Sequence, residues 1–336
     1  MSDPDQPPTP DRLRTVLEEA NHEKAATCLD RLGTADAETR KHALRAAREI
    51  AEERPHSFQD LADQCSAFLT DDDRAVRLTA AKLFVALSAS EPAVVLSAVD
   101  ALAGRLADED EFYFVRARCA EALGYVAIEA PDEVADPETL ADLRLGLAFD
   151  EPEVKEKLAK ALAHVALGDP NRLRHHASSL AEHLDDEAEL VRYYLCTALV
   201  VVGCAYPDKL AGAAGPLQAR LDDANPYVVG RAAEAIGLLA TSPVSVEWDR
   251  SLDDIETDHE DPPAFLIDRL SFCRQQLAPE QSGEAPDEVG TIASIRDEID
   301  DVVEEMTASD DGSCPHCGLD LPEGGPPMCP QCGAPR

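Results

Sequence analysis

The chain has 336 residues, and its 67 Asp and Glu residues outnumber its 30 Lys and Arg residues to give a formal net charge of −37. A hydrophobic content of 44% excludes a wholly disordered chain, and the negative charge argues against a general affinity for nucleic acid. Self-repulsion of this size is screened only by strong salt, because the Debye length falls to about 3 Å at 1 M. We therefore expect a cytoplasm with molar salt, as in salt-accumulating halophiles, rather than an ordinary acidic cytosol.

The N-terminal sequence predicts neither secretion nor membrane insertion. MSDPDQPPTPDR is acidic and rich in Pro, unlike a signal peptide, and we expect residues 1–10 to be disordered. The longest apolar run, around LCTALVVVGCA, is too short to span a bilayer. Six cysteines before the last 30 residues occur singly, as expected of small buried residues in a reducing compartment. These features predict a cytoplasmic protein that makes no use of a membrane.

Six copies of one pattern follow, and they predict a single repetitive unit over residues 11–278. Each copy has an Asp-rich loop and then Val-Arg or a related pair. We number each copy from the residue before that Arg or its counterpart, the reference position. Positions 0, 4, 7 and 11 are apolar or small in all copies except for Thr39, and they share one face of a helix. The reference positions are 37 to 39 residues apart: Thr39, Val76, Val115, Val154, Val191 and Val228.

A second amphipathic stretch precedes the reference helix from the second copy onward, for example SFQDLADQCSAFL. Each copy is thus a helix, a short loop and a second helix. One such hairpin cannot bury both of its faces alone, whereas stacked copies can. The pattern predicts an all-α fold, an α-solenoid of about six hairpins, closed by a capping helix at AFLIDRLSFCRQQL.

The period, the Asp-rich loop and the Val-Arg pair resemble HEAT repeats, of the short kind grouped with bilin-lyase-like HEAT repeats, over about residues 22–241. The resemblance implies that the Arg after each reference position pairs with a loop Asp, which builds a ladder along the stack. The sixth copy has Val229 at this place, so the ladder should stop there. The implied pairs are Asp71 with Arg77, Asp110 with Arg116, and Asp186 with Arg192.

The resemblance also places the second helix of each hairpin on the concave side, with positions 1, 3 and 6 pointing outward. Lys or Arg fills 11 of these 18 positions and an acidic residue fills two, on a protein whose surface should be acidic by default. The ladder accounts for five of the 11. Solvated helix faces often carry such residues without a function; the alternative is a groove for an acidic protein, with a Tyr as its anchor. The candidate partner-binding residues are Arg45, Lys82, Arg118, Lys157, Lys160, Tyr194 and Arg231.

After a linker at residues 279–290, residues 291–307 predict an amphipathic helix. Its apolar residues follow the 3-4-3-4 spacing of a heptad seam, about two heptads long. A seam this short either docks on the solenoid or associates with a second copy through residues 292–306. The seam residues are Ile292, Ile295, Ile299, Val302 and Met306.

A second linker, residues 308–313, leads to a predicted zinc ribbon at residues 314–336. Its four cysteines follow C-x2-C-x11-C-x2-C, and four thiolates in a tetrahedral array suit one Zn²⁺ per chain. Such a closed site has no open position for water or substrate, so the zinc would be structural. The segment resembles small ribbons appended to many archaeal proteins and predicts a second protein-interaction module. The ligands are Cys314, Cys317, Cys329 and Cys332.

Taken together, these features predict a non-enzymatic scaffold or adaptor that binds protein partners. One alternative is a nucleic-acid-associated protein, since HEAT-like DNA glycosylases use a basic concave face. The other is an enzyme like the bilin lyases or deoxyhypusine hydroxylase. The hydroxylase holds iron with His-Glu pairs on its repeat helices. The pairs in this chain, His22-Glu23 and His259-Glu260, lie outside the repeating positions of the six copies.

Overall fold

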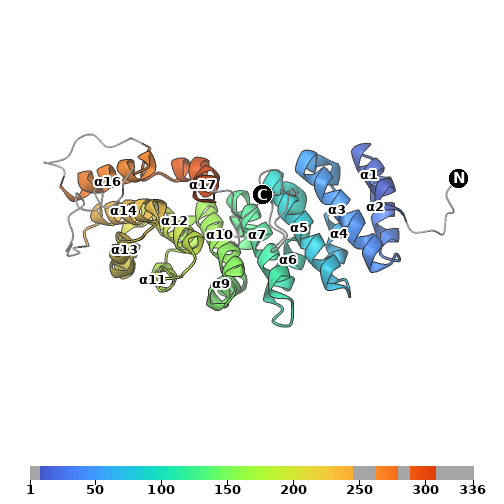
Figure 1. Ribbon diagram of the computed structural model, residues 1–336, viewed down its shortest axis with the longest axis horizontal. Helices are drawn as coiled ribbons and strands as arrows, with labels where there is room; N and C mark the ends of the chain where they lie inside the picture. The colour runs from blue at the N-terminus through green and yellow to red at the C-terminus, as the bar shows by residue number, and fades with distance from the viewer. Residues whose placement is uncertain (1–7, 245–261, 279–287, 308–336) are drawn as a thin grey trace, which may run out of the picture.

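The computed structural model describes residues 8–244, 262–278 and 288–307. Within these ranges the chain forms only helices, and helical hairpins stack side by side into an elongated array (Figure 1). The predicted all-α fold of repeated hairpins is confirmed. No helix in the described ranges is long and apolar enough to cross a bilayer.

The second helices of the six hairpins form one continuous layer in which each helix packs against the next. The reference positions explain this layer, because Val76, Val115, Val154 and Val228 are fully buried. Side-chain caps start several of these helices; in one of them, Asn225 accepts hydrogen bonds from two backbone N–H groups. The layer consists of α3 (Ala37–Glu53), α5 (Arg74–Ser90), α7 (Tyr113–Glu129), α10 (Pro152–Gly168), α12 (Glu189–Ala205) and α14 (Pro226–Ala240).

The first helices form the other layer and are shorter than the sequence pattern suggests. From the second hairpin on, each is split into short α and 3-10 segments, and the first segment of each begins at a Pro. Proline fixes φ and removes a backbone donor, so it favours such short segments. The α segments of this layer are α2 (His22–Leu32), α4 (Ala62–Ser66), α6 (Val99–Ala107), α8 (Pro131–Val134), α9 (Pro137–Leu145), α11 (Ala177–Ala181) and α13 (Ala214–Arg220), and the 3-10 segments are η1 (Pro55–Phe58), η2 (Ala67–Thr70), η3 (Pro92–Ala98), η4 (Gly146–Ala148), η5 (Pro170–Arg172) and η6 (Pro207–Ala213).

Additional helices cover both ends of the stack. α1 (Pro10–Glu18) packs on α2 and α3, and its N-cap Thr9 lies inside the segment expected to be disordered, so the ordered chain starts earlier than predicted. Residues 1–7 of that segment lie outside the described residues. At the other end, α16 (Ala264–Leu277) packs on α14. This approach requires glycine, because a Cβ on Gly230 would lie 2.7 Å from the ring of Phe265.

The cysteines of the described residues are all free, and five of the six are buried. This agrees with their expected role as small core residues. Burial raises the pKa of the Cys65 thiol to about 12, which keeps the thiol protonated and unreactive.

A candidate protein-binding face

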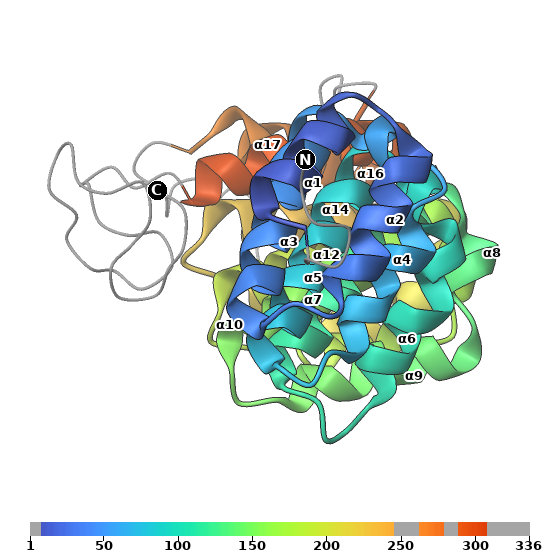
Figure 2. The ribbon, with the colours of Figure 1, turned by 90° about the vertical axis from the view of Figure 1, so that its right-hand side faces the viewer.

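The outward side chains of α3, α5, α7, α10, α12 and α14 form what we call the second-helix face. It lies on the side of the stack opposite the first helices, as the view along the stack shows (Figure 2). All the basic candidates predicted from the sequence belong to these six helices.

The ladder at one edge of this face joins neighbouring repeats rather than residues within one repeat. The Arg192 side chain donates to the backbone carbonyl of Asp186 in its own loop and forms its ion pair, at 2.7 Å, with Asp223 of the next loop. Arg77 likewise donates to the Asp71 carbonyl and pairs at 2.7 Å with Glu111. The within-repeat carboxylate pairs implied by the HEAT resemblance are therefore replaced by pairs that cross the repeat boundary.

The remaining rungs follow the same rule with one exception. Arg40 pairs with Asp71 at 2.6 Å, and Lys155 pairs with Asp186 at 2.5 Å. Arg116 instead donates to a backbone carbonyl and lies over the ring of Phe149, 5.0 Å from its centroid.

The expected pair of Asp110 with Arg116 is therefore wrong, and Glu111 rather than Asp110 is the ladder acid of that loop. The ladder ends at Val229, which is fully buried.

Helix α17 (Ile292–Thr307) lies on the second-helix face and contacts α12 (Figure 1). Its seam residues Ile295, Ile299 and Val302 are buried against the chain itself. Of the two predicted outcomes for this helix, the structure shows docking on the solenoid. Because the seam is covered, it is not available to a second copy in this arrangement.

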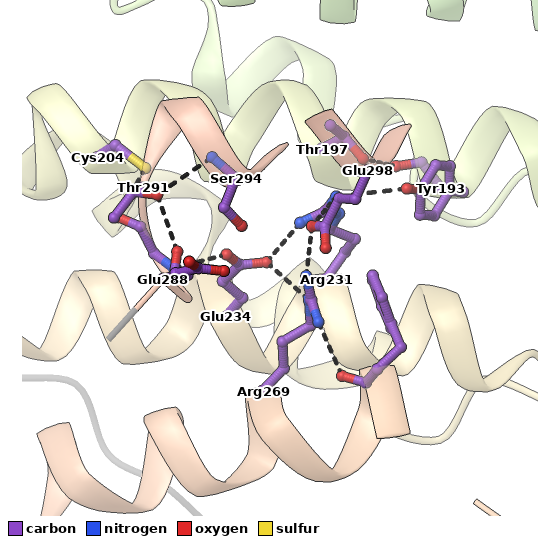
Figure 3. A network of polar contacts seen from close by, with 12 residues as sticks. Tyr193, Thr197, Cys204, Arg231, Glu234, Arg269, Glu288, Thr291, Ser294 and Glu298 are labelled. Carbon is purple, nitrogen blue, oxygen red and sulfur yellow. Dashed lines mark hydrogen bonds and ion pairs between the residues drawn. The ribbon is translucent and has the colours of Figure 1, made fainter. Parts of the chain in front are cut away.

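A cluster of charged side chains holds α17 on this face. Glu298 of α17 lies 2.8 Å from Arg231 of α14 and also pairs with Arg269 of α16, and Figure 3 shows it pointing between them. Beneath it, Glu234 contacts Arg231 at 2.7 Å and Arg269 at 3.2 Å. Two arginines thus hold two carboxylates, and each charge is balanced.

Glu234 also holds the turn that leads into α17. It accepts a hydrogen bond from the backbone N–H of Gly290 at 2.9 Å, and Gly290 adopts a φ of +80° that favours glycine. Burial alone would raise the pKa of the Glu234 carboxyl, but Arg231 and Arg269 outweigh it and hold that pKa below its ordinary value. Val289 is buried and Gly290 is partly buried, although residues 288–290 were predicted as the end of a linker; residues 279–287 lie outside the described residues.

The predicted basic ridge is consequently divided into a covered half and an open half. In the covered half, Arg231 is fully buried, and Lys160 is 9% exposed, with Asp300 of α17 at 3.7 Å. Tyr194 is 1% exposed and packs edge-on against Tyr193, so it is a core residue rather than a surface anchor. The expectation that these three side chains face an open groove is wrong, because adjacent helices and α17 cover them.

The open half retains four of the predicted residues. Arg45 is exposed, and Lys82, Arg118 and Lys157 are half-buried. Neither Arg45 nor Lys82 has a carboxylate within 4 Å in the described part of the chain. Burial lowers the pKa of the Lys82 ammonium, and the neighbouring positive charges of Arg118, Arg48 and Arg45 lower it further. The carboxylate of Glu153 opposes this shift only in part.

Two residues of the charge cluster, Glu298 and Arg269, were not predicted from the sequence as site residues. The position of Arg269 could have indicated its role. It lies among Leu266, Leu270 and Cys273 on the apolar stripe of its helix, where an unpaired charge is costly. Glu298 stands next to the seam residue Ile299, and nothing in the sequence distinguishes it from the exposed acidic residues of α17.

The predicted zinc ligands lie outside the described residues. Among the described residues, no group of three or more His, Cys, Asp or Glu side chains is arranged to hold a metal ion.

No protein-family model and no curated protein matches this chain. Several solved structures are similar to it. An engineered protein matches with a TM-score of 0.63 and 19% identity, over 90% of this chain and 78% of its own. A designed armadillo repeat protein in complex with the peptide (KR)4 matches with a TM-score of 0.56 and 20% identity, over 68% and 99%. Computationally designed armadillo repeat proteins for modular peptide recognition match with a TM-score of 0.53 and 20% identity, over 67% and 99%. At these identities the likeness shows the fold alone, a stack of helical repeats.

Proposed function

We propose that this protein is a non-enzymatic scaffold that binds an acidic segment of a partner protein on the open half of the second-helix face. The observation that carries the proposal is α17. The acidic helix lies on the same face and places Glu298 between two arginines that belong to the solenoid. The face therefore accepts an acidic helix in its own chain, and its basic character continues past the end of α17 through Arg118, Lys82 and Arg45.

The net charge of the whole molecule limits how this face can bind an acidic partner. At −37, the chain repels acidic partners at long range, so a basic surface on it must act at short range. In the molar-salt cytoplasm that we propose, bare attraction is screened, and binding must also bury apolar area. The similarity of the fold to designed peptide-binding repeat proteins supports the use of this surface for protein segments.

Affinity purification from the native cytoplasm at its own salt concentration tests the proposal. The wild-type chain should capture a defined partner, and the triple reversal Arg45→Glu, Lys82→Glu and Arg118→Glu should lose most of that partner. Lys209→Glu is the matched control, because Lys209 lies on the first-helix side and pairs, within the described ranges, with its neighbour Asp208 at 2.8 Å. Equal recovery by the folded triple variant and the control would place the binding site elsewhere.

We further propose that residues 314–336 form a zinc ribbon that serves as a second interaction module. Four thiolates bind Zn²⁺ tightly, and metal binding would itself fold so short a segment. The prediction is one zinc ion per chain. Cys329→Ser should release the metal and leave the helical circular dichroism of the repeats unchanged, because they bury their own core. Elemental analysis that finds iron, or no metal after anaerobic purification, contradicts it.

A further inference from the structure

The site that holds Glu298 of α17 is built from three side chains, which we call the covered triad: Arg231, Glu234 and Arg269. Arg231 and Glu234 occupy positions 3 and 6 of the sixth repeat, and Arg269 reaches Glu234 from the next helix in the stack. The side chain of Arg231 is fully buried and that of Arg269 is 4% exposed. Glu298 is the ligand of this triad and contacts both of its arginines.

The same arrangement recurs three repeats earlier, in what we call the open triad: Arg118, Glu121 and Lys157. Arg118 and Glu121 of α7 occupy the same repeat positions, 3 and 6, with a contact of 2.6 Å. Lys157 reaches Glu121 from the next helix, α10, at 3.8 Å. Burial alone would raise the pKa of the Glu121 carboxyl, but Lys157 and Arg118 hold it below its ordinary value, as the two arginines do for Glu234.

The two triads differ in what reaches them from outside the stack. No described segment brings a carboxylate onto the open triad from above. Lys157 has a second contact with Glu156 of its own helix at 2.6 Å, whereas Glu121 is the one ion-pair partner of Arg118 among the described residues. The Arg118 side chain is 28% exposed, in contrast to the buried Arg231. Next to Arg118, Lys82 of α5 supplies a further positive charge without an ion pair in the described residues, although the carboxylate of Glu153 acts on it electrostatically.

The open triad also has an apolar strip beside it, as the covered triad does. α17 contacts α12, in which Tyr193 and Val200 are fully buried at positions 2 and 9 of the repeat. In α5, which precedes the open triad as α12 precedes the covered one, these positions hold Leu78 and Val85. Both are half-buried and share one face of α5. The apolar side of an approaching helix would cover them.

From this equivalence we infer that the open triad is a second carboxylate-binding site, which takes a Glu or Asp from an acidic amphipathic helix of a partner protein as the covered triad takes Glu298. The inference rests on the proposed scaffold function and specifies its ligand. The carboxylate lies between Arg118 and Lys157, within reach of Lys82, and the apolar side of the partner helix packs on Leu78 and Val85. α17 itself shows the required pattern, in which the binding Glu298 lies between Ile295 and Ile299.

A labelled synthetic peptide of residues 288–307 is the probe for this site, because it carries the pattern of α17. Fluorescence anisotropy should show that it binds the full-length chain. Glu298→Gln in the peptide should weaken binding about tenfold. Glu304→Gln, which removes the same charge from an exposed position, should change it less than twofold. These two peptides leave the protein untouched, so the comparison does not depend on the folding of a variant.

Substitution in the protein then locates the bound peptide. Arg118→Gln should weaken binding of the wild-type peptide about tenfold but should not further weaken binding of the Glu298→Gln peptide, because both changes remove the same contact. No binding of the probe, or equal binding to the Arg118→Gln chain, overturns the inference. Loss of binding with Arg269→Gln and not with Arg118→Gln also overturns it, because the peptide would then have displaced α17. Partner capture that depends on Arg45 alone would leave the scaffold function standing without this site.

Discussion

His164 is the buried residue of the second-helix layer whose charge state depends most directly on folding. It is 1% exposed in α10, its Nδ1 has no hydrogen-bond partner among the residues that the structure describes, and its ring lies 4.9 Å from that of Tyr125. Burial lowers the pKa of His164 well below its ordinary value, and the nearby Lys160 lowers it further. The imidazole is therefore neutral in the folded protein at neutral pH.

This depressed pKa predicts a loss of stability in mild acid. Below about pH 6.5 the unfolded chain binds a proton at His164 that the folded chain refuses, so the free energy of unfolding falls as the pH falls. Between pH 8 and pH 5.5 the wild type should lose about 1.4 kcal/mol more than His164→Leu, in which the group is absent. Urea titrations at both pH values provide the measurement. The same loss in both chains would show that His164 is protonated in the folded state.

The ladder acids also act at the residue scale, through an ion pair and a turn together. Asp223 pairs with Arg192 and accepts a hydrogen bond from the backbone N–H of Asn225 at 3.0 Å. Asp223→Asn keeps the shape but removes the charge that faces Arg192, and it should lower the free energy of unfolding by about 1–3 kcal/mol. Asp72→Asn, on an exposed loop position, should stay within about 0.5 kcal/mol of wild type. Equal effects of the two changes in urea denaturation would mean that the ladder adds no stability.

Residue periodicity predicted which positions are buried in the hairpins, but it misplaced part of the ridge. Tyr194 and Arg231 lie at positions that point away from the apolar stripe of their own helices. Glu298 of α17 covers Arg231 from more than 60 residues later in the chain, and Tyr194 packs on its neighbour Tyr193; no local pattern encodes either contact. The predicted ladder pairs were wrong for a different reason. A spacing of six residues does not distinguish a contact with the backbone carbonyl from an ion pair with the carboxylate.

At the scale of the elements, substitution of Gly by Ala at two helical positions should change the stability of the protein in opposite directions. A Cβ on Gly168, at the end of α10, would lie 1.9 Å from the backbone carbonyl oxygen of Ala127 in α7. Gly168→Ala must push these helices apart and should cost about 1–3 kcal/mol. Gly104→Ala in α6 meets nothing within 4 Å and should stabilise the helix by about 0.5–1 kcal/mol.

Melting temperatures of the two variants measure this difference directly. Gly168→Ala should melt below the wild type and Gly104→Ala above it. A Gly168→Ala chain as stable as the wild type would contradict the close packing of α7 on α10.

The second helices were predictable because each has a long apolar stripe with a repeating reference position, and α16 was predictable from its apolar stripe alone. The first helices were less predictable, because their prolines divide them into short segments whose boundaries no periodicity marks. The docking of α17 was left open by its sequence, since a two-heptad seam suits a solenoid surface and a second copy equally well. What decides it is the buried charge cluster, whose members come from three separate helices.

At the scale of the whole molecule, the charge of −37 predicts that folding depends on salt. Salt screens repulsion between exposed carboxylates over distances longer than the Debye length, which is about 10 Å at 0.1 M and about 3 Å at 1 M. The melting temperature followed by circular dichroism should therefore rise strongly between 0.1 M and 2 M KCl. A melting temperature that stays constant over this range would contradict adaptation to molar salt.

The central claim is that partner proteins bind the second-helix face, and site-specific photo-crosslinking tests it most directly. A photoreactive amino acid is placed at Lys82 on this face and, as the control, at Leu145 of α9, which is 72% exposed on the first-helix side. The account predicts that a captured partner crosslinks to position 82 and not to position 145. Crosslinking at position 145 with none at position 82 would contradict it.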